Sequence, residues 1–172
     1  TLYKNFSINN EVEFTVEANP ETLTKNKIKV LKKMGVNRLS IGLQAYDDKL
    51  LKVLGRIHDV KRFEKAYFEA RETGFENINV DIIFGIPGQN PDILKEDIRT
   101  AFENGATQIS TYPFIDFTFA SNSYKPLPEK YKKKMLGEIN RFAALNGYVR
   151  TSVWTFSRPR TIKYSSITRE NF

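Results

Sequence analysis

The sequence of 172 residues contains no cysteine, and this absence excludes several kinds of site at once. Without thiolates the chain forms no disulfide, no cysteine-ligated zinc site and no cysteine nucleophile. It also cannot hold an iron–sulfur cluster through cysteine of its own. Histidine is nearly as scarce, because His58 is the only one in the sequence. A metal site built from several histidines is therefore excluded, and we predict no metal ligand in this chain.

Long apolar runs and a leader-like beginning are also missing from the sequence. No apolar run approaches the roughly 20 residues that a membrane-spanning helix needs. Residues 1–10 lack the charged and then apolar layout of a signal peptide. We therefore expect a cytoplasmic protein without a membrane partner. Because the sequence starts at Thr1 rather than Met, we also expect a piece of a longer protein or a processed chain.

The residues that are present indicate a globular protein with a basic surface. Aromatic residues are plentiful, with 13 Phe and 8 Tyr, which argues against disorder. The formal net charge is +7, which allows anionic partners such as a tetrapyrrole carboxylate. We expect no nucleic-acid partner, because the lysines lack the interleaved aromatics of a single-strand platform. The densest basic group is interpreted mainly as a solvated helix face; it consists of Lys125, Lys130, Lys132, Lys133 and Lys134.

One local design occurs four times along the chain: an amphipathic helix, a glycine, and a short apolar strand. Thr24, Asp59 and Asn90 are expected to cap three of the helices, and Pro128 starts the fourth. In the first helix Ile28, Leu31 and Met34 share one face and are predicted to be buried. Each helix is expected to end at a glycine in the left-handed conformation; these glycines are Gly35, Gly74, Gly105 and Gly147.

The spacing of the glycines is typical of βα units, whose helices return each strand parallel to the previous one. The sequence therefore predicts an α/β fold with a parallel sheet. Composition alone leaves open whether that sheet is doubly wound or part of a barrel. We expect one domain over residues 1–157 and a polar tail over 158–172. The predicted strands cover residues 12–17, 38–42, 78–84, 108–112 and 148–154.

Polar side chains follow or interrupt these strands where a parallel sheet binds its ligands, at the carboxyl ends. Glu17 ends one strand, Gln44 follows the next, and Asp81 lies within an apolar run that leads into the turn at 85–88. Carboxylates and an amide suit a ligand with an ammonium group and hydroxyls. The turn is either part of the site or a tight βα connection, and it lacks the glycine spacing of a dinucleotide site.

Each candidate also has a structural interpretation. Glu17 could form a surface salt bridge with a lysine, and Gln44 could cap the following helix. Arg56 could be an ordinary surface arginine, and His58 more often makes a structural hydrogen bond than a catalytic one. Asp81 is expected to point into a barrel interior or at a ligand, because an unpartnered buried carboxylate is costly.

Four phrases of the sequence, taken together, resemble one family. They are Glu-Ala-Asn-Pro at 17–20, the stretch 35–44, Leu-Gly-Arg-Ile-His at 54–58 and the stretch 79–89. In this order and spacing they resemble the radical S-adenosylmethionine (SAM) family of oxygen-independent coproporphyrinogen III oxidases and their haem-chaperone relatives. The resemblance covers roughly residues 13–112 and is highly specific.

The resemblance implies a truncated part of a TIM-type (β/α)6 radical SAM barrel, with strands three to six and C-terminal additions. The family's Cys-x3-Cys-x2-Cys loop and its Gly-Gly-Gly-Thr-Pro stretch are absent here, and the resemblance places both upstream. The [4Fe–4S] cluster is thus expected in the intact protein, and this chain alone is expected to be inactive. Two missing strands would leave a sheet edge open, and open edges favour self-association.

The same resemblance assigns cofactor-binding residues and leaves the catalytic residues unknown. It implies that Glu17 meets the amino-acid end of SAM, and that Gln44, Arg56 and Asp81 line the SAM site. Asp81 is expected near the ribose hydroxyls, and Ile115 is expected near the adenine.

The implied activity is that of a radical SAM oxidoreductase similar to coproporphyrinogen dehydrogenase. In the family, a reduced cluster cleaves SAM reductively, and the resulting radical abstracts hydrogen from a tetrapyrrole-type substrate. Two alternatives are a non-catalytic haem chaperone and a radical SAM methyltransferase of haem breakdown. Stretches 153–156 and 164–169 resemble a haem-utilisation and oxidase-like branch, which argues against coproporphyrinogen itself as the substrate.

Overall fold

The computed structural model describes residues 2–9, 12–115 and 125–159, and its centre is a single sheet with the strand order β1-β2-β3-β4-β6-β5. Strands β1 to β4 pair in parallel, as predicted. The last two strands pair antiparallel, β6 with both β4 and β5. The strands are β1 (Thr15–Ala18), β2 (Arg38–Gln44), β3 (Asn77–Phe84), β4 (Gln108–Pro113), β5 (Val149–Arg150) and β6 (Thr155–Ser157).

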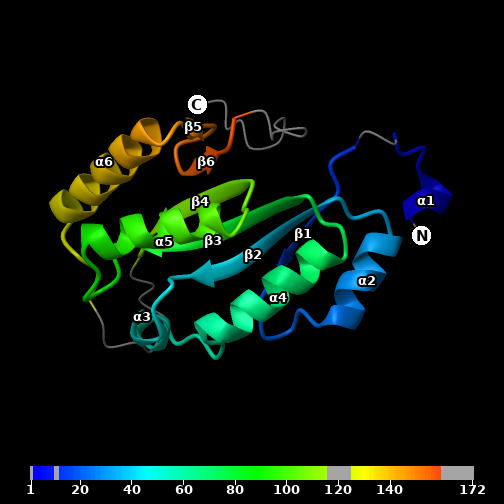
Figure 1. Ribbon diagram of the computed structural model, residues 1–172, viewed down its shortest axis with the longest axis horizontal. Coiled ribbons are helices and arrows are strands. Elements are labelled where there is room, and N and C mark those ends of the chain that lie inside the picture. The colour runs from blue at the N-terminus through cyan, green and yellow to red at the C-terminus, as the bar shows by residue number, and fades with distance from the viewer. Residues whose placement is uncertain (1, 10–11, 116–124, 160–172) are drawn as a thin grey trace.

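The helices connect the parallel strands, and Figure 1 shows α2 and α4 on one side of β1 and β2 and α6 beside the hairpin of β5 and β6. The predicted caps are confirmed: Thr24, Asp59 and Asn90 each accept a hydrogen bond from a first-turn N–H. The four predicted helix-ending glycines all have positive φ. The helices are α1 (Leu2–Asn5), α2 (Lys25–Lys33), α3 (Asp48–Val53), α4 (Val60–Glu72), α5 (Pro91–Glu103) and α6 (Glu129–Leu145).

The apolar core lies between one face of the sheet and the helices. Successive strand residues point to opposite faces, so one alternate set of each strand can be wholly apolar. In β3 this set is no more than 1% exposed, and it packs against apolar residues of α4 and α5. The set from the two central strands consists of Leu39, Ile41, Leu43, Ile78, Val80, Ile82 and Phe84.

The strand predicted at 148–154 is wrong in both extent and direction. The chain reverses between β5 and β6, where the N–H of Thr151 donates to the carbonyl of Thr155 at 2.9 Å. The Ser152 hydroxyl also donates to that of Thr155, at 2.9 Å. Ser and Thr favour such turns because their hydroxyls bond locally. The resulting hairpin sends β6 back antiparallel to β4, whereas a parallel strand would need a further crossover.

Two smaller predictions also fail. Met34 is 54% exposed rather than buried, because α2 ends at Lys33 and Met34 is its C-cap. The first strand begins at Thr15 rather than at residue 12, and Val12 is 42% exposed. The Asn37 side chain replaces strand pairing there, since it accepts from the N–H of Phe14 and donates to the carbonyl of Val12, both at 2.8 Å.

The basic group on α6 is not a purely solvated face, because Lys132 is only 8% exposed. Its aliphatic stem lies over Gly85, where an added Cβ would be 2.8 Å from Cγ of the lysine. Its ammonium group donates to the carbonyl of Phe114 at 3.4 Å and forms an ion pair with Glu129. The other lysines of the group are exposed, as predicted; they are Lys125, Lys130, Lys133 and Lys134.

Two further expectations concern the limits of the molecule. Within residues 2–9, 12–115 and 125–159, no helix has the length and apolar character to cross a bilayer.

The tail predicted over 158–172 lies outside the described residues from 160 onward, as does the stretch 164–169. At the predicted boundary the N–H of Arg158 still donates to the carbonyl of Thr107, at 3.1 Å. The domain boundary stays a prediction.

Candidate functional site

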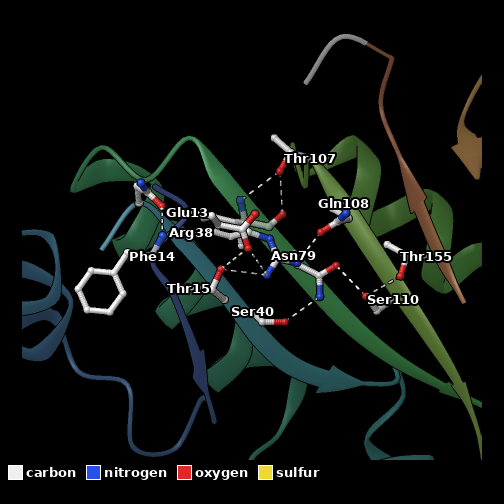
Figure 2. A network of polar contacts seen from close by, with 12 residues as sticks. Glu13, Phe14, Thr15, Arg38, Ser40, Asn79, Thr107, Gln108, Ser110 and Thr155 are labelled. Carbon is white, nitrogen blue, oxygen red and sulfur yellow. Dashed lines mark hydrogen bonds and ion pairs between the residues drawn. The ribbon is translucent and has the colours of Figure 1, made fainter. Parts of the chain in front are cut away.

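The face of the sheet opposite the helices is polar, and it carries most of the predicted site. Because the apolar residues of each strand face the helices, the alternate residues share this second face. The register aligns Glu17 with Ser40 and Asn79 across β1 to β3. One step further along the strands, it aligns Gly42 with Asp81 and Ser110. The set also includes Thr15, Arg38, Gln108, Thr155 and Ser157, several of which are drawn in Figure 2.

Gly42, near the carboxyl end of β2, is the point where three candidate side chains meet. A Cβ at this position would lie 2.6 Å from Nε2 of Gln44 and 3.6 Å from Nη2 of Arg56. It would also lie 3.7 Å from Oδ1 of Asn19, which accepts a hydrogen bond of 2.8 Å from the same Arg56 nitrogen. Because glycine has no side chain, these groups come close to the backbone there, and Gly42 forms a small floor with an amide, a guanidinium group and a second amide around it.

Asp81 borders this floor, because it is the register partner of Gly42 on β3. Its two carboxylate oxygens accept hydrogen bonds from Asn79 Nδ2 at 2.8 Å and from Ser40 Oγ at 3.0 Å. Burial raises the pKa of Asp81, the bonds from Ser40 and Asn79 lower it, and the negative charge of Glu17 raises it again. Glu17 and Asp81 thus lie on the same face of the sheet, and their opening into one shared ligand site stays a prediction.

Gln44 reaches the site through an unusual backbone conformation. Its φ is +79°, the only positive value among non-glycine residues in the described part of the chain. Non-glycine residues rarely adopt this region, and such strain is often found at functional sites. The pairing of β2 with β3 shifts between Gly42 and Gln44, which marks a bulge. The interpretation of Gln44 as a helix cap is wrong, because Asp47 caps α3.

Arg56 and His58 both follow α3 but lie in different surroundings. Arg56 turns toward Gly42 and is held by Asn19. His58 is 5% exposed, with Nε2 3.1 Å from the carbonyl of Leu43 and Nδ1 3.1 Å from Glu21. The structural interpretation of His58 is therefore confirmed, since it ties the α3–α4 connection to the end of β2.

Glu17 and Ile115 are more exposed than the other candidates. No ion pair involving Glu17 occurs among residues 2–9, 12–115 and 125–159, so its salt-bridge interpretation gains no support there. Glu17 and Asn19 line a cavity of ≈ 450 Å³ beside α2, and Arg56 lines another of ≈ 480 Å³. Ile115 is 53% exposed beyond the end of β4. It follows β4, and β3 lies between β4 and the strand that carries Gly42.

Sequence reasoning missed several residues of this site. Tyr112 of β4 is one, because it lies two residues after Ser110 on the same face of the sheet; burial and then the charge of Asp81 raise the pKa of its phenol. Asn79 is another, although the alternation of Asn77, Asn79 and Asp81 along β3 was available as a signal. Asn19 was named in the sequence only as part of the Glu-Ala-Asn-Pro stretch at 17–20, with no role of its own.

The turn at 85–88 belongs to the βα connection rather than to the ligand floor. The side-chain oxygen of Gln89 accepts from the N–H groups of Gly85 at 2.9 Å and of Ile86 at 3.4 Å. Its amide donates back to the carbonyl of Ile83 at 3.3 Å. The interpretation as a tight connection is therefore favoured.

The residues present fit a SAM-like ligand and do not fit an iron–sulfur cluster. An amide and a guanidinium group at Gly42, with the Asp81 carboxylate beside them and Glu17 on the same face of the sheet, match a ligand with ammonium, carboxylate and hydroxyl groups. The sequence offers no thiolate for a cluster. Within the described residues, no group of three or more potential metal-ligating His, Asp or Glu side chains occurs.

The fold and candidate site define a class: an α/β protein with a mostly parallel sheet and polar side chains near the carboxyl ends of its strands, where such folds bind ligands. Residues 2–101 match the radical SAM superfamily. The chain therefore belongs to this superfamily, and the family resemblance noted from the sequence is confirmed.

Three proteins of known name are similar to this chain. The chain is 48% identical over 103 residues to the heme chaperone HemW of Bacillus subtilis, covering 60% of this chain and 27% of that protein. It is 42% identical over 149 residues to the oxygen-independent coproporphyrinogen-III oxidase-like protein HemZ of the same organism. This match covers 83% of this chain and 30% of that protein. The solved structure of coproporphyrinogen III oxidase (HemN) of Escherichia coli, described as a radical SAM enzyme, matches with a TM-score of 0.80 at 25% identity. This match covers 92% of this chain and 38% of that chain.

These matches confirm the expected fold, a partial radical SAM barrel of mostly parallel strands. They also set the scale of the chain, which spans between about a quarter and two-fifths of the length of these relatives. The superfamily implies SAM and a [4Fe–4S] cluster as cofactors. The relatives include both an oxidase and a heme chaperone, so the family alone leaves the activity open.

Proposed function

We propose that the full-length protein binds SAM at the Gly42 floor and uses it in a radical reaction on a tetrapyrrole-type substrate. The observation that carries this proposal is the convergence of Gln44, Arg56 and Asn19 on Gly42, with Asp81 beside it. Membership of the radical SAM superfamily supports SAM as the ligand of these residues.

Each residue has a role that follows from its chemistry. Glu17 would pair with the ammonium group of SAM, and Arg56 would pair with its carboxylate, because a guanidinium group matches that geometry. Asp81 would accept hydrogen bonds from the ribose hydroxyls. Gln44 would contact the ligand through its amide, and Ile115 would contact the adenine.

The chemistry that SAM supplies in radical SAM enzymes is hydrogen abstraction after reductive cleavage of a carbon–sulfur bond. This chain contributes binding and orientation, because it has no cysteine to hold the cluster. The relatives named for haem and coproporphyrinogen support a tetrapyrrole-type substrate or haem as the partner. Porphyrin biosynthesis as the pathway and the cytoplasm as the location stay predictions.

The test uses the full-length protein with its cluster reconstituted, and replaces Asp81 with Ala. We expect SAM affinity to fall at least roughly tenfold, because a charge-assisted hydrogen-bond acceptor is lost. Calorimetry measures binding, and chromatography of 5′-deoxyadenosine measures cleavage. Asp92→Ala is the matched control, since the Asp92 side chain is 90% exposed on α5. Unchanged affinity and cleavage in Asp81→Ala would reject the assigned role.

A haem chaperone is the second candidate, because the HemW of Bacillus subtilis carries that name. Haem titration of the full-length protein, compared with its SAM-cleavage rate, separates the two activities. An oxidase cleaves SAM in the presence of its substrate and changes the substrate mass through oxidation. A chaperone binds and transfers haem unchanged, and a methyltransferase adds the mass of a methyl group.

A further inference from the structure

Asn79 is the centre of a hydrogen-bond network that crosses the sheet beneath the proposed SAM site. It is 1% exposed and lies on the polar face of β3, one alternate position before Asp81. Its Nδ2 donates to Ser40 on β2 and to Asp81, both at 2.8 Å. Its Oδ1 accepts from Ser110 on β4 at 3.1 Å, and Figure 2 shows Asn79 between Ser40 and Ser110.

The amide of Asn79 is suited to this position in a way that few side chains are. A carboxylate accepts hydrogen bonds only, so the atom facing Asp81 must be the amide nitrogen, which has two protons to donate. Both protons and the amide oxygen are used, which fixes the side chain in one orientation. Ser40 then donates its own proton to the second oxygen of Asp81, at 3.0 Å. Asp81 is therefore held from below through both of its oxygens.

Asp81 has little support from neighbouring cations. The negative charge of Glu17 on β1 raises its pKa, and the cation that lowers it is Arg38 on β2. Arg38 is engaged elsewhere, by Gln108 and by Thr15 at 3.4 Å, and its effect on the pKa of Asp81 is the smallest of the named causes. Hydrogen bonds from Asn79 and Ser40 lower that pKa against burial and against Glu17.

We propose that Asn79 is a positioning residue, which holds the Asp81 carboxylate charged and oriented so that its free lone pairs face the ribose hydroxyls of SAM. This inference rests on the proposed function. It adds that the affinity of the site depends on a residue that lies beneath the ligand and does not contact it.

The test compares Asn79→Ala, Asn79→Asp and Ser40→Ala in the full-length protein. Asn79→Asp keeps the shape of the side chain but removes the donor and adds a negative charge. We expect the pKa of Asp81 to rise in all three, most in Asn79→Asp. Carbon-13 NMR of labelled Asp carboxyl groups measures this without ligand. SAM affinity should fall roughly tenfold in the Asn79 variants, and its pH profile should shift to higher pH.

Ser157→Ala is the matched control, because Ser157 is fully buried on the same face and accepts from Gln108 at 3.3 Å. It should leave both the titration of Asp81 and the pH profile of binding unchanged. Ser40→Ala keeps the test valid if the Asn79 variants do not fold, which thermal melting detects.

The outcomes separate this inference from the proposed function. If wild type binds SAM, Asp81→Ala weakens binding and the Asn79 and Ser40 variants keep the wild-type titration and pH profile, only the positioning role is overturned. If wild type does not bind SAM at all, the proposed function fails and the role falls with it.

Discussion

At the scale of single residues, the candidate site depends on the missing side chain of Gly42. The floor that Gly42 leaves open is bordered by Gln44, Arg56 and Asn19, at the distances given above. The backbone of Gln44 is constrained by its positive φ within a bulge, so only the side chain of this residue can move away from Gly42. A small change at Gly42 should therefore affect binding more than folding.

Gly42→Ala tests this directly. The new methyl group would displace the Gln44 amide, whose Nε2 lies 2.6 Å from the Cβ position. The clash involves the end of a flexible side chain, and alanine is favoured over glycine in a strand by about 0.5–1 kcal/mol. We expect SAM affinity to fall roughly tenfold while the unfolding free energy stays within about 1 kcal/mol of wild type. Calorimetry and urea unfolding measure the two quantities.

Gly137→Ala is the matched control, because nothing lies within 4 Å of a Cβ at that position in α6. Alanine should stabilise the helix by about 1 kcal/mol and leave SAM affinity unchanged. A Gly42→Ala protein that binds SAM like wild type would mean that the floor is not part of the ligand site.

At the scale of elements, the segment that carries Gln44 is attached to α5 by one buried carboxylate. Asp97 is 2% exposed, and its Oδ1 accepts from the backbone N–H of Tyr46 at 3.2 Å. Its Oδ2 has no hydrogen-bond partner among the described residues. Burial raises the pKa of Asp97 to about 7, the bond from Tyr46 lowers it, and the charges of Asp47 and Glu96 raise it. Helix α5 thus supports the site from outside it.

Asp97→Asn should change how stability depends on pH. The raised pKa means that the folded protein binds the Asp97 proton more tightly than the unfolded chain, whose value is 3.8. Loss of the proton therefore lowers the free energy of unfolding. This loss of stability is absent below about pH 4 and grows until about pH 7. Asparagine keeps the acceptor for Tyr46 and has no such cost. We expect the variant to be more stable at pH 8 by up to about 4 kcal/mol, with no gain at pH 4.

Urea unfolding at several pH values measures this difference. Glu103→Gln is the control, because Glu103 is exposed near the end of the same helix. It should leave the pH dependence unchanged. A gain in Asp97→Asn that is equal at both pH values would assign the effect to packing rather than to ionisation.

The elements themselves were predictable to different degrees. Helices with a side-chain cap and a terminal glycine were predicted well, because both signals are local. The hairpin of β5 and β6 was missed because its direction is set by a turn of hydroxyl contacts at 151–155. Burial of Lys132 was missed because it depends on Gly85, a residue far away in sequence.

At the scale of the whole molecule, β1 is one edge of the described sheet, and its pairing is with β2 alone. An unpaired edge offers backbone groups to another chain. We expect this 172-residue chain to self-associate as its concentration rises, and sedimentation equilibrium measures the mass. Association through backbone pairing should persist at raised salt, whereas contacts between charged surfaces should weaken. A monodisperse monomer throughout the series would contradict the prediction.

The site was predictable where it rests on strand ends and not where it rests on the interior of the sheet. Glu17, Gln44 and Asp81 stand out because polar residues follow or interrupt apolar strands. The alternation along β3 places Asn79 on the polar face, but its role and that of Asp97 lie in what they contact on other elements. The contacts of Asn79 depend on the register of β2, β3 and β4, and the contact of Asp97 depends on how α5 packs against residue 46; the local sequence does not give either.

The position of β6 beside β4 also has a consequence for how the protein is made. Ser110 and Thr155, whose hydroxyls lie 3.4 Å apart, are separated by 45 residues of sequence. A ribosome adds roughly 5–20 residues per second, so several seconds pass between the synthesis of these two residues. During that interval the edge of β4 that later pairs with β6 stays unpaired. A nascent polypeptide stalled or terminated in α6 should therefore be a preferred client of chaperones that shield unpaired strands.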